Sequence, residues 1–162
     1  FLYRVYASTR EDEMAVVPWN ETEKQSFLAM QFTAQSTHYR EQFGQAEFQL
    51  VLLGDEPVGR LYLDRPEDHI RIIDFALLSE HRGQGIGSHL LREILAEGQA
   101  AGLPVRIHVE SYNPALRLYY RLGFTKIGDQ GVYYLMEWTP SQPDPTGTQT
   151  QLSLEQEQGN LL

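Results

Sequence analysis

The sequence predicts a mixed α/β (α+β) domain whose sheet is mostly antiparallel but contains one parallel pair of strands. Residues 47–53, 58–63 and 69–78 are apolar, strand-like segments joined by short turns with glycine, proline or aspartate, which is typical of an antiparallel meander. A glycine-rich loop, an amphipathic helix over residues 85–101 and a further strand over residues 104–109 follow. Strand–helix–strand units cross over in the right-handed sense, so the last strand is expected to lie parallel to the strand at 69–78.

The N-terminal third is predicted to form one strand and two helices. Residues 2–6 alternate in a way that indicates a strand. A short helix begins within residues 9–14 and closes near Pro18. Asn20 followed by Glu23 has the form of a capping box, which would start a helix that runs to about residue 39.

The C-terminal third is predicted to form a short helix and a closing hairpin, followed by a tail. The helix covers residues 113–121, and the hairpin strands cover residues 124–127 and 132–138. From Thr139 the chain is rich in Pro, Gln and Thr and has no Lys or Arg. We therefore expect one folded domain over residues 1–139 and a low-complexity tail over residues 140–162. Residues 149–154 alternate enough to join a sheet edge; a neighbouring chain is one candidate to hold them, which would make a homodimer.

Composition narrows the class of protein. The 162 residues include no cysteine, which excludes disulfides, thiolate metal sites and a cysteine nucleophile. A net charge of −9 argues against a general nucleic-acid binder and mildly favours a cationic acceptor such as an amine. No apolar run approaches the roughly 20 residues that span a bilayer, and no signal-peptide pattern opens the chain. We expect a cytoplasmic protein that does not enter a membrane.

The loop between the central strand and its helix has the features of a phosphate site. Residues 82–87 read Arg-Gly-Gln-Gly-Ile-Gly. Glycines let backbone N–H groups turn inward, and the start of a helix adds unpaired N–H groups and a positive dipole end. The Gly-Lys-Ser/Thr of a P-loop is absent, and Ser88 stands where a dinucleotide fingerprint needs its third glycine. The structural alternative is a helix start whose glycines serve close packing.

Two signatures resemble those of one enzyme family. Residues 82–87 resemble Arg/Gln-x-x-Gly-x-Gly/Ala, the acyl-CoA loop of the GNAT family of N-acetyltransferases. Residues 113–124, Asn-Pro-Ala-Leu-Arg-Leu-Tyr-Tyr-Arg-Leu-Gly-Phe, resemble the second signature of that family, in the family's order and spacing. The resemblance covers residues 47–138 well and the first 45 loosely. It implies the GNAT acyl-CoA N-acyltransferase fold, a twisted sheet of about seven strands flanked by four or five helices, with acetyl-CoA as co-substrate and no metal.

The resemblance also implies site residues. Tyr119 falls on the position of the family's general acid, and Asp74 and Glu110 are two candidates for the base. By themselves, a tyrosine on a short amphipathic helix is usually a core residue, and residues 76–78 read only as a buried strand. The following residues are implied to bind coenzyme A: Ala76, Leu77, Leu78, Arg82, Gly83, Gln84, Gly85, Ile86, Gly87, Ser88, Asn113 and Tyr119. Polar residues on the second helix are implied to lie at the acceptor pocket: Gln31, Gln35, His38 and Arg40.

Histidines give no support for a metal. His108 and Glu110 alternate onto one face of their strand, but two ligands are too few. The other histidines are interpreted as surface or loop residues: His38, His69, His81 and His89.

The function we expect is acetyl-CoA-dependent N-acetyltransfer to a primary amine of a small molecule or peptide, by direct attack of the amine on the thioester. Two alternatives stay open. One is an acyl-CoA-binding or regulatory module without catalysis, and the other is an O-acyltransferase on the same fold.

Overall fold

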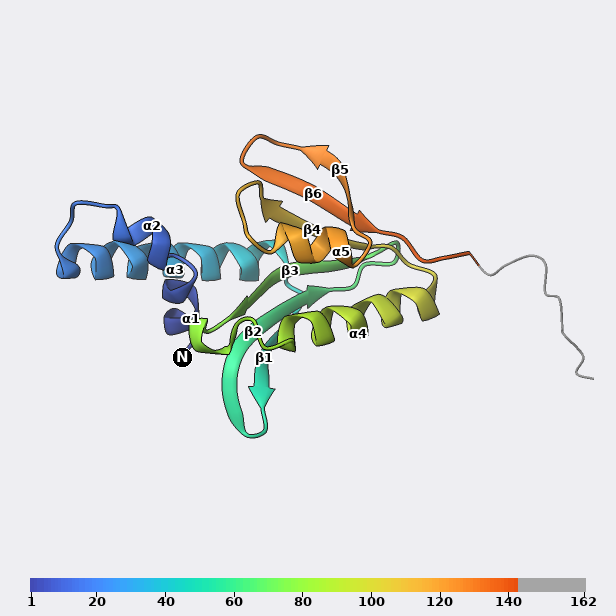
Figure 1. The fold of residues 1–162 in the computed structure, drawn as a ribbon, viewed down its shortest axis with the longest axis horizontal. Coiled ribbons are helices and arrows are strands. Elements are labelled where there is room, and N and C mark those ends of the chain that lie inside the picture. The colour runs from blue at the N-terminus through green and yellow to red at the C-terminus, as the bar shows by residue number, and fades with distance from the viewer. Residues whose placement is uncertain (143–162) are drawn as a thin grey trace, which may run out of the picture.

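A computed structural model describes residues 1–142; the predicted edge segment at 149–154 lies outside the described residues. The ribbon in Figure 1 shows a sheet with helices on both sides. The elements in chain order are α1 (Leu2–Ser8), α2 (Glu11–Ala15), α3 (Glu21–Gln42), β1 (Glu47–Leu53), β2 (Glu56–Asp64), β3 (Ile70–Leu77), the 3₁₀ turn η1 (Ser79–His81), α4 (Ile86–Ala101), β4 (Val105–Glu110), α5 (Leu116–Arg121), β5 (Thr125–Asp129) and β6 (Tyr133–Trp138).

The sheet confirms the predicted fold class. Its six strands lie in the order β1-β2-β3-β4-β6-β5. The pair β3–β4 is parallel and all the other pairs are antiparallel. The parallel pair is the one predicted from the strand–helix–strand unit. No helix among residues 1–142 is long and apolar enough to cross a bilayer.

The prediction of a strand at residues 2–6 is wrong, and the part of the sheet within residues 1–142 has six strands where about seven were expected. These residues form helix α1, whose Val5 and Tyr6 are buried. Val5 belongs to a small cluster with Ala76 and Leu78 at the end of β3. Apolar residues at positions 2, 5 and 6 fit a helical face, and five residues of alternation are too short to exclude one.

The helix α3 begins where the sequence predicts. The Asn20 side chain accepts a hydrogen bond from the backbone N–H of Glu23, and the Glu23 side chain accepts one from the backbone N–H of Asn20, both at 2.9 Å. This capping box satisfies two N–H groups that an α-helix leaves unpaired at its start. The helix ends at Gln42, slightly later than predicted.

The helices cover the sheet in two layers. The main core lies between the sheet and the α4–α5 layer and includes Leu91 and Ile94 of α4, Ile72 of β3 and Ile107 of β4. On the other face, Tyr39 of α3 packs edge-on against Tyr62 of β2. Because neighbouring residues of a strand point to opposite faces, β2 can present Leu61 and Leu63 to the main core and Tyr62 to α3.

The strands β3 and β4 separate soon after they meet. Their parallel ladder contains three residue pairs and ends at Ile72 and Ile107. Next to the end of this ladder, Tyr62 of β2 faces Asp74 of β3, and Leu63 of β2 faces Ile72 of β3. Ile73 has no partner on β2 and forms a β-bulge. Beyond this bulge β3 stays paired with β2, and β4 stays paired with β6. The sheet therefore opens between β3 and β4.

Candidate functional site

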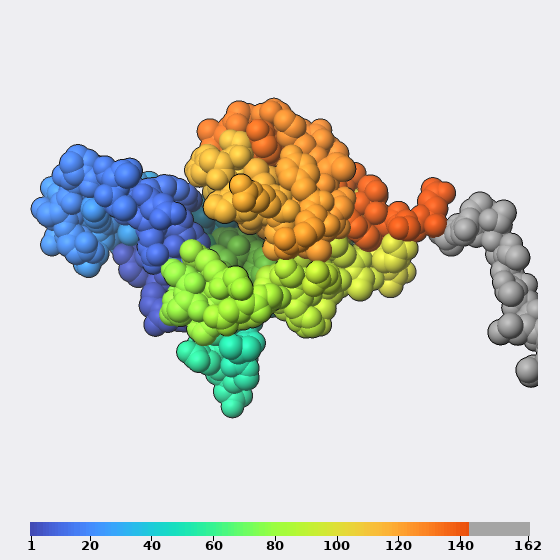
Figure 2. All heavy atoms as spheres, in the orientation of Figure 1, coloured from blue at the N-terminus to red at the C-terminus, as the bar shows by residue number. Residues whose placement is uncertain are grey.

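The opening between β3 and β4 leaves backbone groups of β3 available. The N–H of Leu78 donates to Val58 on β2, and its carbonyl accepts from the N–H of His81. Hydrogen bonding alternates along an antiparallel pair of strands. The backbone N–H and C=O groups of Ala76 therefore also point toward β2, while those of Phe75 and Leu77 point toward the opening. In the space-filling view the surface is hollowed where the light-green η1–α4 segment, the orange α5 region and the blue N-terminal helices meet (Figure 2).

The glycine-rich loop gets its shape from two left-handed residues. Gly83 has a φ of +70°, and Gly85, the residue that caps α4, has a φ of +85°. A Cβ added at either glycine meets no atom within 4 Å, so close packing does not explain them. At Gly87 a Cβ would make an ordinary contact with Phe75 at 3.7 Å. The loop therefore depends on backbone conformation at Gly83 and Gly85.

The first turn of α4 keeps its own N–H groups available for a ligand. Gly85 offers no side-chain cap, and the first turn contains no acidic residue. A helix of 16 residues carries a partial positive charge at this end. An uncapped start of this kind can bind an anionic group through backbone N–H groups, even in an acidic protein.

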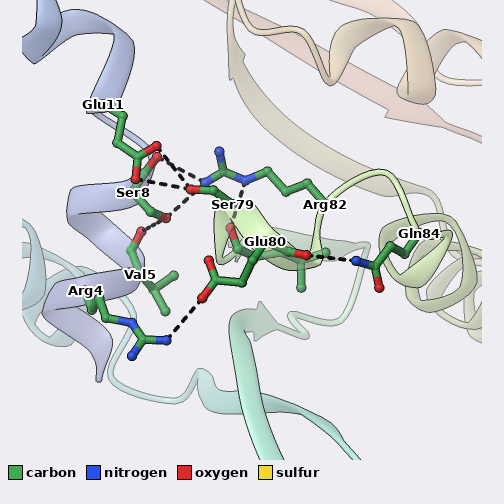
Figure 3. Close-up of polar contacts among 9 residues, drawn as sticks. Arg4, Val5, Ser8, Glu11, Ser79, Glu80, Arg82 and Gln84 are labelled. Atoms are coloured by element: carbon green, nitrogen blue, oxygen red, sulfur yellow. Dashed lines mark hydrogen bonds and ion pairs between the residues drawn. The ribbon is translucent and has the colours of Figure 1, made fainter.

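Arg82 and Gln84 anchor the loop to its surroundings (Figure 3). The Arg82 Nε donates to the carbonyl of Leu77 at 2.9 Å, and its Nη2 donates to the Ser8 hydroxyl at 3.0 Å and the Ser8 carbonyl at 3.2 Å. Gln84 Nε2 donates to the carbonyl of Glu80 at 2.8 Å. Both side chains are therefore engaged within the protein, and Arg82 ties the loop to α1.

Tyr119 lies in the core of the α4–α5 layer. Its side chain is 5% exposed, and its ring packs edge-on against Phe124 at 5.5 Å between centroids. Burial raises the pKa of Tyr119, and the negative charges of Asp74 and Glu110 raise it further. Glu110 projects from the face of β4 opposite to the core side chains Val105, Ile107 and Val109. Tyr119 thus lies on the α4–α5 side of the sheet, and the two carboxylates lie near enough for their charges to act on its phenol.

Asp74 lies in a buried ion pair on the α3 side of the sheet. Arg60 Nη2 donates to Asp74 Oδ2 at 2.6 Å and to Gln35 Oε1 at 2.9 Å. The rings of Tyr6 and Tyr62 lie 6.0 and 5.4 Å from the guanidinium carbon of Arg60. The structure thus brings Gln35, one of the residues assigned to the acceptor pocket, next to Asp74.

The environment of Asp74 affects its acid–base behaviour. Burial raises the pKa of Asp74, while the positive charge of Arg60 and a hydrogen bond from Tyr39 oppose the rise. Burial also raises the pKa of Tyr39, and the charge of Asp74 adds to that rise. Asp74 already accepts a short hydrogen bond from a cation, which leaves it less free to take a proton from a substrate.

Glu110 is more accessible and more loosely held. Its side chain is 23% exposed, its Oε1 lies 4.0 Å from Arg10 Nη2, and its Oε2 accepts from Asn113 Nδ2 at 3.3 Å. Asn113 also accepts a hydrogen bond at Oδ1 from the N–H of Ala115, at 2.9 Å, which shapes the start of α5. The second signature therefore positions Asn113 beside Glu110.

Arg60 is the residue of this site that sequence reasoning missed. Its side chain is 3% exposed, and its Nε lacks a hydrogen-bond partner among the described residues. The signal was present, since Arg60 is a charged residue within an apolar strand, as Asp74 is. Pairing the two required the register of β2 on β3 with its bulge, which the residues alone do not reveal.

A second hollow lies beside the glycine-rich loop. The groove, of about 540 Å³, is bounded by α1, α2, α3 and the end of β3, and acidic Glu11, Glu21 and Glu80 share its lining with Arg4 and Lys24. Within residues 1–142 no group of three or more His, Cys, Asp or Glu side chains is arranged to hold a metal ion.

His69 lies in the loop before β3, which agrees with its interpretation as a surface or loop residue. Its side chain is nevertheless buried, at 7% exposed, with Nδ1 2.8 Å from Asp68 Oδ1. Burial and the nearby Arg71 lower the pKa of His108, so its imidazole favours the neutral form.

Comparison with known proteins identifies one matching family. Residues 4–124 match the sequence model described as the acetyltransferase (GNAT) family. A search of curated proteins found no match.

Solved structures show the same fold at low sequence identity. The PaiA N-acetyltransferase from Thermoplasma acidophilum in complex with coenzyme A is 19% identical, covers 85% of this chain and 88% of its own, and has a TM-score of 0.62. PH1933 from Pyrococcus horikoshii is 21% identical, with 87% and 89% covered and a TM-score of 0.61. An acetyltransferase from Thermus thermophilus is 20% identical, with 85% and 88% covered and a TM-score of 0.59.

Proposed function

The chain belongs to the GNAT family of acetyltransferases, and from this premise we propose that it moves an acetyl group from acetyl-CoA to a primary amine of a small molecule or peptide. The single observation that carries the proposal is the opening of the sheet between β3 and β4 beside the uncapped start of α4 and its left-handed glycine loop. Tyr119, Asp74 and Glu110 are the candidates in this region for the acid and the base that the transfer needs.

The chain offers separate surfaces to the two ends of acetyl-CoA. The uncapped start of α4 and the left-handed loop would hold the pyrophosphate through backbone N–H groups. The backbone of Phe75 and Leu77 would bond the pantetheine arm in the opening. The carbonyl of Leu77 already accepts a hydrogen bond from Arg82. The N–H of Leu77 is therefore the group that would bind the thioester oxygen. This arrangement resembles an added strand.

The reaction needs two proton transfers. The amine nitrogen attacks the carbonyl carbon of the thioester, a C–N bond forms, and the C–S bond breaks. The Tyr119 hydroxyl gives its proton to the leaving sulfur, and a carboxylate takes the proton that the amine nitrogen loses. Burial keeps Tyr119 protonated but also makes it a weaker acid, so the developing charge on sulfur must draw the proton.

The contacts favour Glu110 over Asp74 as the proton acceptor. Asp74 is held by Arg60 at 2.6 Å, whereas Glu110 is partly exposed and lies 3.3 Å from Asn113 and 4.0 Å from Arg10. Asp74 then serves to hold Arg60 and, with it, Gln35 of α3 at the acceptor side. Base catalysis through a water would suit the position of Glu110.

The decisive test compares wild-type protein with Tyr119→Phe. We expect kcat for thiol release from acetyl-CoA with an amine panel to fall by about a hundredfold, with little change in KM for acetyl-CoA. Tyr120→Phe is the matched control, because Tyr120 is adjacent but 50% exposed, and its kcat should stay near wild type. Equal rates for Tyr119→Phe and wild type would remove Tyr119 from the mechanism.

Product masses separate the remaining alternatives. Incubation with amines, alcohols and peptides should yield acetylated amines for the proposed N-acetyltransferase. Acetylated alcohols alone would identify an O-acyltransferase. Calorimetric binding of acetyl-CoA without any product would identify a binding module.

A further inference from the structure

The strand β1 exposes an unusual amount of apolar surface at one edge of the sheet. Among residues 1–142 it is the outermost strand of the sheet, and there it pairs with β2 alone. Phe48, Leu50, Leu52 and Leu53 are 44%, 51%, 56% and 51% exposed. The hairpin that β1 forms with β2 projects from the body of the molecule (Figures 1 and 2). An outer strand also presents unpaired backbone groups along its free edge.

The opposite edge of the sheet has more of the features that block pairing than β1 has, although the β1–β2 pair also has a register shift, between Val51 and Leu52. The strand β5 has five residues, its register is broken between Lys126 and Gly128, and Lys126 pairs with Asp129 at 3.1 Å. Charges, bulges and short length are the usual means of blocking an exposed edge. The sequence of β1, Glu-Phe-Gln-Leu-Val-Leu-Leu, has seven residues and neither lysine nor proline.

We propose that β1 is the interface of a homodimer, in which two copies pair their β1 strands antiparallel about a twofold axis at Leu50. The strand suits this pairing because it is self-complementary. Leu50 would face Leu50 of the second copy, and Phe48 would face Leu52, so a row of apolar side chains would meet on one face. The two six-stranded sheets would become one continuous sheet of twelve strands.

The charges of β1 itself do not oppose a second copy as the occupant. The only charged residue of β1 is Glu47, which would face Leu53 of the second copy, and its carboxylate already contacts Arg65 of its own chain at 2.9 Å. No like charges oppose each other across the seven pairs. The chain as a whole carries −9, so added salt should screen the repulsion between copies and strengthen this apolar interface.

The first experiment measures the oligomeric state of the full chain by sedimentation velocity over a roughly hundredfold range of concentration. Wild type should shift from monomer to dimer, more readily at high salt. Leu50→Lys would place two lysines face to face at the axis and should remain monomeric. Ile127→Lys is the matched control, with the same charge change at a 49% exposed residue on the protected edge β5, and it should still dimerise.

A charge swap tests the axis itself. Leu50→Lys mixed with Leu50→Glu should regain dimer, whereas each variant alone should not. A dimer of Leu50→Lys as stable as wild type would overturn the proposal and point to another surface, such as the tail at 143–162. A wild-type chain that stays monomeric at every concentration would overturn it as well.

Cross-linking tests the register, because the natural chain has no cysteine. Residues that face each other in an antiparallel pair have Cα atoms about 4.5–5.5 Å apart, which suits a disulfide. Leu50→Cys should therefore form disulfide dimers by itself. Phe48→Cys and Leu52→Cys should each cross-link poorly alone but well when mixed, and Ile127→Cys should cross-link poorly. Equal yields for all these variants would contradict the register.

Discussion

At the scale of single residues, Gly85, which caps α4, and Gly87, in the first turn of α4, differ in how much they need to be glycine. Gly85 has a φ of +85° with open space around it, whereas Gly87 tolerates a Cβ at ordinary contact distance from Phe75. We expect Gly85→Ala to cost about 1 kcal/mol of unfolding free energy and to weaken coenzyme A binding, because alanine disfavours a left-handed backbone. Gly87→Ala should leave both quantities near wild type.

Denaturant unfolding and calorimetry with coenzyme A check this pair. Gly85→Glu adds an anionic side chain beside the start of α4, and it should abolish binding in a protein that still folds. Unchanged affinity in folded Gly85→Glu protein would refute the assignment of the loop to the pyrophosphate.

The roles of Glu110 and Asp74 can be distinguished by substituting each carboxylate with its amide. We expect Glu110→Gln to lower kcat by about a hundredfold with little loss of stability, because Glu110 is partly exposed. Asp74→Asn leaves Arg60 buried without its anion and should cost about 3 kcal/mol of unfolding free energy. Steady-state kinetics beside urea unfolding checks both. A larger kcat loss in a stable Asp74→Asn protein would reverse the two roles.

The sequence predicted several residues of the candidate site but not the side chains that contact them. It singled out Tyr119, Asp74, Glu110 and Gln35 because signatures and isolated polar groups are visible in the chain. The contact of Asp74 with Arg60 depends on strand register, which is a long-range property.

At the scale of elements, most boundaries were predictable because local signals agree with tertiary packing. The capping box at Asn20 starts α3, and the left-handed Gly102 ends α4. The prediction for residues 2–6 failed because a short alternating segment also fits one helical turn. Burial against β3 decides between the strand and the helix, and the sequence does not show that burial. The bulge at Ile73 is likewise a consequence of pairing, so the residues alone do not predict the opening that it accompanies.

The packing of α4 on the sheet depends on a glycine. A Cβ at Gly98 would lie 2.9 Å from the carbonyl of Leu103 and 3.0 Å from Val105. We expect Gly98→Ala to lower the unfolding free energy by about 1–2 kcal/mol, since overpacking against backbone outweighs the gain in helix propensity. Gly44→Ala, where the nearest atom is 3.9 Å away, should be close to neutral.

Thermal unfolding checks this pair, and coenzyme A affinity gives a second readout. Gly98 lies more than three turns along α4 from Gly85, so affinity should stay at the wild-type value in Gly98→Ala. A Gly98→Ala protein as stable as Gly44→Ala would show that α4 can move away from β4 without cost.

At the scale of the whole molecule, the net charge should affect how readily a charged acceptor binds. A chain of −9 attracts cations over distances comparable to the Debye length, about 10 Å at 0.1 M salt. If the acceptor is cationic, its KM should rise several-fold between roughly 0.02 and 0.5 M NaCl, because salt screens this attraction. An aromatic amine that is uncharged at neutral pH should show little change. Equal salt dependence for both amines would contradict steering by net charge.

The short seam between β3 and β4 has a mechanical consequence. Three residue pairs join a three-stranded sheet of β1, β2 and β3 to a three-stranded sheet of β4, β6 and β5. Under shear or heat, such a seam allows the two sub-sheets to melt as partly independent cooperative units. A molecule that bonds to both sides of the gap would couple them, so the calorimetric and van't Hoff enthalpies of unfolding should converge when it is bound.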